Sequence, residues 1–191
     1  KDFSRDMLAW LKFHRGMPIG EVIPEMLKYL TNNPASPHRI AYEHVMVDEY
    51  QDLNRAEQDL LSMLAEAARY SVIGDEDQSI YSFKHAHPEG ITEFKERHLG
   101  THDEHMDECR RCPSLVVGMA NSLIENNAKR SSRALKPFKG NPDGEIHIVQ
   151  WDGVAEEAKG VTRYIKAKID RSEIGAGDVL VLSTRRNFGL A

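Results

Sequence analysis

The sequence has 191 residues, with 40% hydrophobic and 29% charged side chains, a balance typical of globular proteins that excludes a largely disordered chain. It contains no apolar run near the roughly 20 residues that cross a bilayer and no signal-peptide pattern, so we expect a cytoplasmic protein. Because the net charge is −5, contacts to nucleic acid must come from local basic faces. One candidate face comprises Lys129, Arg130, Arg133, Lys136 and Lys139.

Two apolar patterns with helical spacing open the chain, at residues 3–11 and 22–30, with a glycine and a proline between them. They predict two helices. Residues 32–37 are rich in Asn, Pro and Ser and predict a loop. The short apolar run 44–47, which ends in acidic residues, predicts a buried strand.

The next segment has the signature of a helix that returns the chain to a second strand. Asn54 is a good N-cap with Glu57 three positions on, and apolar residues continue at helical spacing to Ala68. Residues 70–73 then predict a strand, ended by a glycine. Strand, helix and strand within about 30 residues predict a βαβ unit of an α/β fold, whose parallel strands place loops and ligands at their C-terminal ends.

A further helix and a second α/β unit are predicted beyond residue 112. Pro113 suits the first turn of a helix that runs to about Asn127. Residues 137–144 form a Pro/Gly/Asn loop, which is the clearest boundary by composition. Beyond this loop a strand, a helix and a strand are predicted at residues 146–151, 155–169 and 179–182.

Two adjacent carboxylates end the first predicted strand, in the stretch VMVDEYQD at residues 45–52. Phosphoryl transfer to water needs one carboxylate to hold Mg²⁺ and a second group to orient and deprotonate the attacking water. Asp48 and Glu49 could supply both. The competing interpretation of such a string, taken alone, is a solvated acidic turn.

The segment VIGDEDQSIYSFKHA at residues 72–86 decides between these interpretations. Together with VDEYQD it closely resembles motifs II and III of superfamily 1A helicases, the UvrD, Rep and PcrA group. The resemblance implies an incomplete RecA-like motor domain with a parallel sheet, followed by the start of a second RecA-like α/β unit. We assign residues 1–112 to the C-terminal part of the first domain and 113–191 to the start of the second.

The resemblance also implies roles for the residues of the two motifs. Asp48 would coordinate Mg²⁺, and Glu49 would be the general base for ATP hydrolysis. Gln78 would sense the γ-phosphate of ATP and link it to the DNA track. ATP and Mg²⁺ are therefore the expected cofactors, and single-stranded or duplex DNA is the expected partner.

The aromatic residues that follow would contact DNA. By the resemblance, Tyr81 and Phe83 would offer their rings to single-stranded bases, a contact worth on the order of 1–3 kcal/mol per base that tolerates any sequence. Their alternative role is core packing. Lys84 stands where the family usually has Arg, which keeps the charge but loses the planar fork, and His85 replaces a usual glycine.

A third, divergent match surrounds two arginines. The family follows motif III with an NYRS-like stretch, and counting back from Asn121 places Arg111 at the arginine-finger position, which stabilises charge on the γ-phosphoryl group. Arg110 would occupy the aromatic position beside the adenine, where a guanidinium could stack instead. The alternative is a pair of surface arginines at the approach to a helix.

The stretch HxxHxxxCxxC offers four potential zinc ligands, namely His102, His105, Cys109 and Cys112. Its two pairs are separated by three residues, whereas finger-type sites usually leave a long connection between them. The alternatives are a polar loop with two half-buried thiols and a redox CxxC, for which no thioredoxin-like context is present. With one CxxC, the chain has no disulfide framework, in agreement with a reducing compartment.

The chain contains no GxxxxGK[ST] loop, which would hold the β and γ phosphates. It also begins without Met inside a helical pattern, so we expect a piece of a longer protein that is inactive by itself. Two hypotheses remain for the parent. One is a DNA helicase or translocase, with 3′ to 5′ direction taken from the family, and the other is a non-catalytic DNA- or partner-binding module derived from a helicase.

Overall fold

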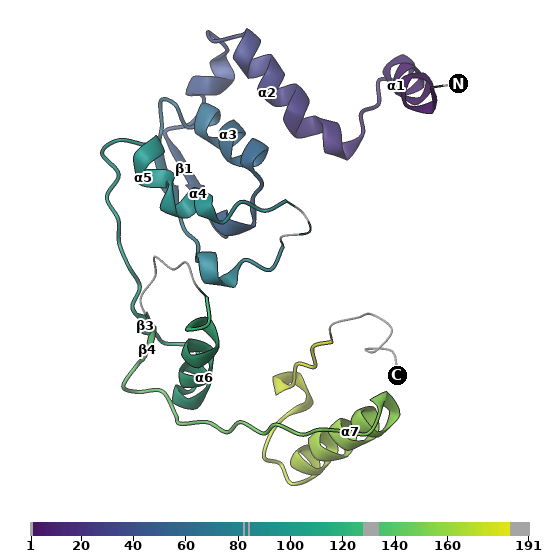
Figure 1. Ribbon diagram of the computed structural model, residues 1–191, viewed down its shortest axis with the longest axis vertical. Coiled ribbons are helices and arrows are strands. Elements are labelled where there is room, and N and C mark those ends of the chain that lie inside the picture. Colours follow the sequence, from purple (N-terminus) through teal and green to yellow (C-terminus); the bar gives the residue numbers. More distant parts are fainter. Residues whose placement is uncertain (1, 82, 84, 128–133, 184–191) are drawn as a thin grey trace. The chain divides into compact units, whose positions relative to one another are not determined.

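The computed structural model describes residues 2–81, 83, 85–127 and 134–183 (Figure 1). The chain divides into two compact units, Lys1–Gly144 and Glu145–Ala191. The helices are α1 (Phe3–Phe13), α2 (Val22–Asn32), α3 (Arg55–Leu64), α4 (Glu89–Thr92), α5 (Phe94–Arg97), α6 (Ser114–Ile124) and α7 (Val154–Asp170). The strands are β1 (His44–Val47), β2 (Arg69–Val72), β3 (Glu108–Cys109) and β4 (Lys136–Pro137).

The two predicted N-terminal helices are confirmed as α1 and α2. The side chain of Asp2 caps α1 by accepting a hydrogen bond from the Arg5 backbone N–H at 3.3 Å. Helix α2 packs against α3 and buries Leu30 completely. The apolar periodicity of α2 therefore reports a true core contact, whereas α1 has no buried residue.

The predicted βαβ unit is confirmed. Strands β1 and β2 pair in parallel, with Val45 opposite Tyr70 and Val47 opposite Val72, and α3 connects them. The Ile73 N–H donates to the Val47 carbonyl at 2.8 Å and extends the ladder beyond β2. The loops that follow the two strands consequently start side by side at one edge of the sheet.

Helix α3 starts with a complete capping box. The Asn54 side chain accepts from the Glu57 N–H at 3.0 Å, and the Glu57 carboxylate accepts from the Asn54 N–H at 2.8 Å. These reciprocal bonds satisfy two donors that the first turn of a helix leaves without partners. They place the start of α3 directly after the acidic stretch that follows β1.

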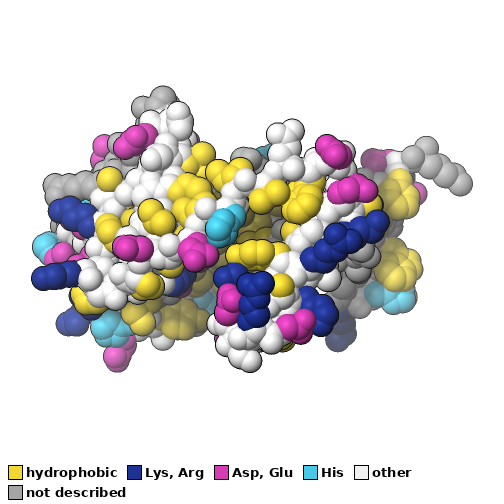
Figure 2. Space-filling view, turned by 90° about the horizontal axis from the view of Figure 1, so that it is seen from below, with side chains coloured by type: hydrophobic (Ala, Val, Ile, Leu, Met, Phe, Trp, Pro, Cys, Tyr) yellow, Lys and Arg dark blue, Asp and Glu magenta, His cyan; other side chains and the backbone are white. Residues whose placement is uncertain are grey.

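Aromatic side chains form part of the core of the first unit. Tyr50 and Phe94 are buried and meet edge to face with ring centroids 5.8 Å apart, and Tyr70 meets Phe94 at 5.2 Å. The buried hydrophobic residues among those described are Leu30, Tyr50, Leu60, Ala65, Phe94 and Val117. Many other hydrophobic side chains remain at the surface, between charged ones, on the face drawn in Figure 2.

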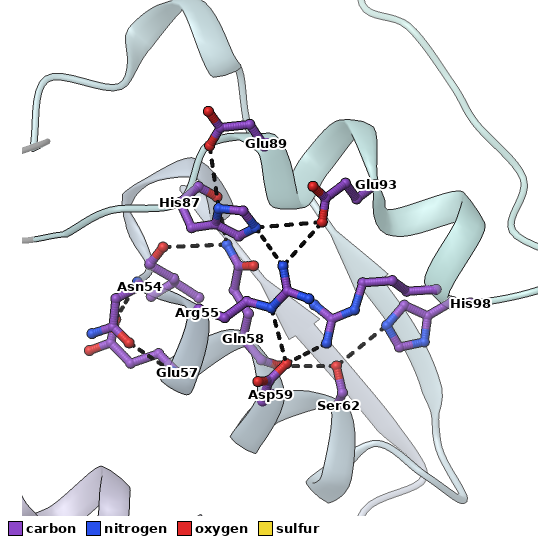
Figure 3. Close-up of polar contacts among 12 residues, drawn as sticks. Asn54, Arg55, Glu57, Gln58, Asp59, Ser62, His87, Glu89, Glu93 and His98 are labelled. Atoms are coloured by element: carbon purple, nitrogen blue, oxygen red, sulfur yellow. Dashed lines mark hydrogen bonds and ion pairs between the residues drawn. The ribbon is translucent and has the colours of Figure 1, made fainter.

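A polar network holds α4 and α5 against α3 (Figure 3). Arg97 of α5 pairs with Asp59 of α3, and Arg55 of α3 pairs with Glu93 at 3.1 Å. The buried amide of Gln58 donates to the His87 carbonyl at 2.8 Å. The segment after the second strand is thus fixed onto the crossover helix by charged and amide groups as well as by the aromatic core.

Helix α6 differs slightly from its prediction. Pro113 is the N-cap and not a residue of the first turn, and the helix ends at Ile124 instead of near Asn127. The N–H groups of its first two residues donate to carbonyls of the 137–144 loop, at Pro142 (2.9 Å) and Asp143 (3.0 Å). These bonds replace a side-chain cap at the start of α6 and tie the loop to it.

The second unit contains the predicted helix, α7, but not the predicted strands. Residues 146–151 and 179–182 belong to the described part of the chain and form no strand, so this prediction was wrong. A strand requires a neighbour that takes up its backbone hydrogen bonds, and neither segment pairs with another. Among the helices that the structure describes, none is long and apolar enough to cross a membrane.

Candidate functional site

Asp48 and Glu49, the two adjacent carboxylates of VDEYQD, lie exposed where β1 ends. Glu49 has a left-handed backbone with φ 53° and ψ 42°, and its N–H donates to Asp48 Oδ1 at 2.9 Å. Such a conformation is uncommon for a residue other than glycine and turns the chain sharply. As a result Asp48 and Glu49 face solvent at the sheet edge, while Tyr50 and Gln51 turn into the protein.

Gln51 connects this acidic pair to the loop after β2. Its side chain is 1% exposed, and both ends of its amide have a partner. Nε2 donates to Glu49 Oε2 at 2.7 Å, and Oε1 accepts from the Asp75 N–H at 3.1 Å. One buried amide therefore joins the two loops that the parallel strands deliver to the same edge.

The loop after β2 is closed by the side chain of Asp75. Its Oδ1 accepts from the Asp77 N–H at 3.0 Å, and its Oδ2 accepts from Gln78 Nε2 at 2.8 Å. Gln78 itself is exposed. A continuous path of hydrogen bonds thus runs from Glu49 through Gln51 and Asp75 to Gln78, so the structure brings together the residues predicted from the two motifs.

The aromatic residues that follow lie next to this turn in the chain. Phe83 is 73% exposed and Tyr81 is half-buried, and their rings meet edge to face at 5.8 Å. This exposure disfavours core packing for Phe83. The amide of Asn127 donates to Asp77 at 3.0 Å, which connects the end of α6 to the turn. Lys84 lies outside the described residues.

The two arginines predicted for the nucleotide lie exposed after β3. The Arg110 guanidinium sits over the Phe138 ring, 5.0 Å from its centroid, and its Nε donates to Glu108 at 3.1 Å. Its predicted stacking capacity is therefore engaged by an aromatic ring of the chain itself. Within the described ranges, neither arginine shares a hydrogen bond or ion pair with Asp48, Glu49 or Gln78.

Both cysteines are free thiols and half-buried; Cys109 ends β3 and Cys112 lies in the turn before α6. Hydrogen bonds from the backbone N–H groups of Cys112 and Arg111 lower the pKa of the Cys109 thiol, whereas partial burial and the neighbouring Cys109 raise the pKa of Cys112. The amide of Asn141 donates to the carbonyls of both cysteines, at 2.7 and 2.8 Å. The turn is thus held from outside by one side chain.

The four potential zinc ligands do not converge in the described part of the chain, where no group of three or more His, Cys, Asp or Glu side chains is arranged around a possible metal position. His102 instead pairs with Glu104 at 2.7 Å.

Sequence reasoning missed the connecting residues. In the sequence, Gln51 stands out only as part of a motif, and Gly74 only as the end of a strand. A Cβ atom on Gly74 would lie 2.4 Å from Gln51 Oε1 and 2.7 Å from Ile91 Cδ1, so this glycine leaves the space that the buried amide occupies. The available signal was the position of the polar Gln51 directly after the aromatic Tyr50, in a segment that follows an apolar strand.

Comparison with known proteins agrees with this arrangement. Residues 10–98 match the UvrD/REP helicase N-terminal domain. The chain is 31% identical over 147 residues to the ATP-dependent DNA helicase PcrA of Staphylococcus aureus, which covers 76% of this chain and 19% of that protein. It is 30% identical over 187 residues to the ATP-dependent DNA helicase UvrD1 of Mycobacterium bovis, which covers 93% of this chain and 24% of that protein.

The chain therefore spans between about a fifth and a quarter of the length of the curated relatives that it matches. The family domain covers the sheet edge, the acidic pair and the turn at Gln78, which are the parts that carry the motifs. The match extends, in the relatives, through α6 and into the second unit. On these matches, the chain belongs to the UvrD/Rep family of superfamily 1A DNA helicases.

Proposed function

We propose that the protein to which this chain belongs is an ATP-dependent DNA helicase or translocase that moves 3′ to 5′ on single-stranded DNA. The observation that carries the proposal is the hydrogen-bonded path from Glu49 to Gln78 at the end of two parallel strands. It joins the carboxylate that we propose for hydrolysis to a turn that is followed by the half-buried ring of Tyr81 and the exposed ring of Phe83. The relatives are named as ATP-dependent DNA helicases, which supports the same activity here.

The acidic pair fits a Mg²⁺–ATP site. Two exposed carboxylates at a sheet edge supply the hard oxygen ligands that Mg²⁺ prefers. Asp48 would hold the ion, which, when bound, stabilises negative charge on the phosphoryl oxygens. Glu49 would orient the attacking water and accept its proton, and Gln78 would contact the γ-phosphate. The fold would then be part of a RecA-like motor domain.

The DNA track is proposed to run past the turn at Gln78. Phe83 and Tyr81 would stack on successive bases, a role that the 73% exposure of Phe83 supports. Lys84 would add a phosphate contact. Binding to both single-stranded and duplex DNA is expected of such a track, since phosphate contacts carry no sequence information.

The arginine roles belong to the same proposal. Arg111 would act as the arginine finger on the γ-phosphate and Arg110 would stack beside the adenine. Both directly precede the second RecA-like domain, which we propose starts at residue 113. For Arg110 this requires release from Phe138 and Glu108. The phosphate-binding loop would lie elsewhere in the longer protein, so we expect the isolated chain to be inactive. We propose that this longer protein acts in the cytoplasm.

The alternative proposal is a non-catalytic DNA- or partner-binding module that retains the helicase motifs as a scaffold. It predicts a parent protein without a GxxxxGK[ST] sequence.

Glu49→Gln in the full-length protein tests the enzyme proposal. We expect the variant to lose ATP turnover, by about 10²-fold or more, because the general base is gone, while nucleotide binding persists. The measurements are steady-state ATPase with and without single-stranded DNA and the affinity for a nucleotide analogue. The control is Glu43→Gln, an exposed carboxylate at the other end of β1. Wild-type turnover by Glu49→Gln would exclude Glu49 as the base.

A further inference from the structure

We propose that Gln51 is a positioning residue that couples the hydrolytic carboxylate of Glu49 to the Asp75–Gln78 turn. This inference rests on the proposed function, since it names the side chain through which events at the turn reach the reaction. Gln51 touches neither substrate nor nucleotide in this scheme. It acts through the two groups that it binds.

The amide of Gln51 is buried. A glutamine side chain that is 1% exposed must satisfy its donors and its acceptor inside the protein, because an unpaired buried polar group costs about 1–3 kcal/mol. Gln51 does so with groups of two different loops, Glu49 Oε2 on one and the Asp75 N–H on the other. Gln51 itself belongs to the first loop, so its bond with the Asp75 N–H is the one that joins the two loops, and it must break if Gln51 and Asp75 separate.

The backbone around Gln51 is also bonded to the segment that contains the end of β2 and the following turn. The N–H of its neighbour Tyr50 donates to the Ile73 carbonyl at 3.0 Å, and the Ser79 hydroxyl donates to the Gln51 carbonyl at 3.4 Å. Gly74 leaves the room for the amide, since a Cβ there would collide with Gln51 Oε1 at 2.4 Å. The amide therefore sits in a fitted position between β2 and the turn.

Gln51 is linked by hydrogen bonds to an exposed group in each loop, Glu49 in the first and Gln78 in the second. Glu49 and Gln78 are both exposed. The carboxylate of Glu49 accepts directly from Gln51, whereas the amide of Gln78 donates to Asp75, whose N–H donates to Gln51. Movement of Gln78 on contact with a phosphate would alter Asp75, whose N–H binds Gln51, and through it the orientation of Glu49. Such positioning groups typically change activity about 10- to 100-fold when removed.

Two substitutions separate the two bonds. Gln51→Met removes both. Gln51→Glu retains an oxygen that can accept from the Asp75 N–H but loses the donor to Glu49. In the full-length protein we expect both variants to lower DNA-stimulated kcat about 10- to 100-fold while KM for ATP changes by less than about threefold. In the same samples, hydrogen exchange of the Asp75 amide should become faster in Gln51→Met and stay slow in Gln51→Glu.

Gln58→Met is the matched control. Gln58 is another completely buried glutamine of the same unit, but its amide donates to the backbone carbonyls of Leu53 and His87. Its replacement should lower the Tm as much as that of Gln51 without changing DNA stimulation or the exchange of the Asp75 amide.

Equal losses of kcat in Gln51→Met and Gln58→Met, or DNA-stimulated turnover that survives both Gln51 substitutions, would overturn the coupling role. A wild-type protein without ATPase activity would refute the proposed function instead. The positioning claim would then be decided by exchange of the Asp75 amide alone, and unchanged exchange in Gln51→Met would refute it.

Discussion

The acidic pair depends on the turn that the four residues 48–51 make after β1. Glu49, which lies two residues beyond the end of β1, has a left-handed backbone. This conformation costs a non-glycine residue on the order of 1 kcal/mol. The turn exposes Asp48 and Glu49 and buries Tyr50 and Gln51. Since the aromatic core holds Tyr50 and the second loop holds Gln51, the buried pair compensates for the strain and fixes the exposed pair.

Gly74→Ala should destabilise the fold and disturb the site together. Its Cβ would meet Gln51 Oε1 at 2.4 Å and Ile91 Cδ1 at 2.7 Å, and overpacking of this kind costs about 1–3 kcal/mol. Gly118→Ala is the control, because a Cβ at this position would enter open space and alanine favours the α6 helix. Urea denaturation of both variants measures the difference. A Gly74→Ala variant as stable as the wild type would contradict the close approach.

His98 should make stability depend on pH. Burial, and then the charge of Arg97, lower the pKa of His98 in the folded state below its ordinary value of about 6.5. The unfolded chain therefore binds a proton more readily, and stability should fall as pH drops below about 6.5 and level off above it. Denaturation at several pH values should show a smaller fall in His98→Gln than in the wild type.

At the scale of elements, the site rests on the β1–α3–β2 crossover. Parallel pairing places both functional loops at one edge, and α3 begins directly after the first of them. The aromatic contacts of Phe94 and the ion pair of Arg97 with Asp59 then hold α5 against this unit. The segment between Gln78 and α4 is consequently anchored at both ends, which suits the DNA contact proposed for it.

Asn54→Ala tests how strongly the cap of α3 supports this arrangement. Loss of the bond from the Glu57 N–H to the Asn54 side chain should lower the free energy of unfolding by about 1 kcal/mol. The exposed helical residue Asn32 gives the control, since Asn32→Ala should change stability by less than about 0.5 kcal/mol. Thermal and urea denaturation report both. Equal effects of the two substitutions would show that the box contributes nothing specific.

At the scale of the whole molecule, hydrophobic burial is concentrated in the first unit, and in the described part of the second unit no residue is buried. The faces of the β1–β2 sheet are partly open, with Met46 79% exposed, although parallel sheets usually have both faces covered. Under the proposed function, strands from other parts of the longer protein would cover these faces.

A pair of substitutions distinguishes the covered face from the open one. Leu30→Ala should destabilise the 191-residue chain by about 2–5 kcal/mol, because this side chain is completely buried between α2 and its neighbours. Met46→Ala should cost less than about 0.5 kcal/mol in the isolated chain. In the full-length protein we expect Met46→Ala to cost more. A large loss from Met46→Ala in the isolated chain would mean that its own residues cover this face.

The sequence by itself determined helices α1, α2 and α3, the parallel β1–α3–β2 crossover and the family, whereas it did not predict α4, α5, β3 or β4 of the first unit. Helices α2 and α3 are readable because periodicity and the Asn54 cap act over a few residues. The strands expected at 146–151 and 179–182 were not determined, because a strand exists only through its neighbour. Tertiary structure alone decided that Gln51 links Glu49 to Asp75, since hydrogen bonds between residues 24 positions apart follow from packing and not from local preference.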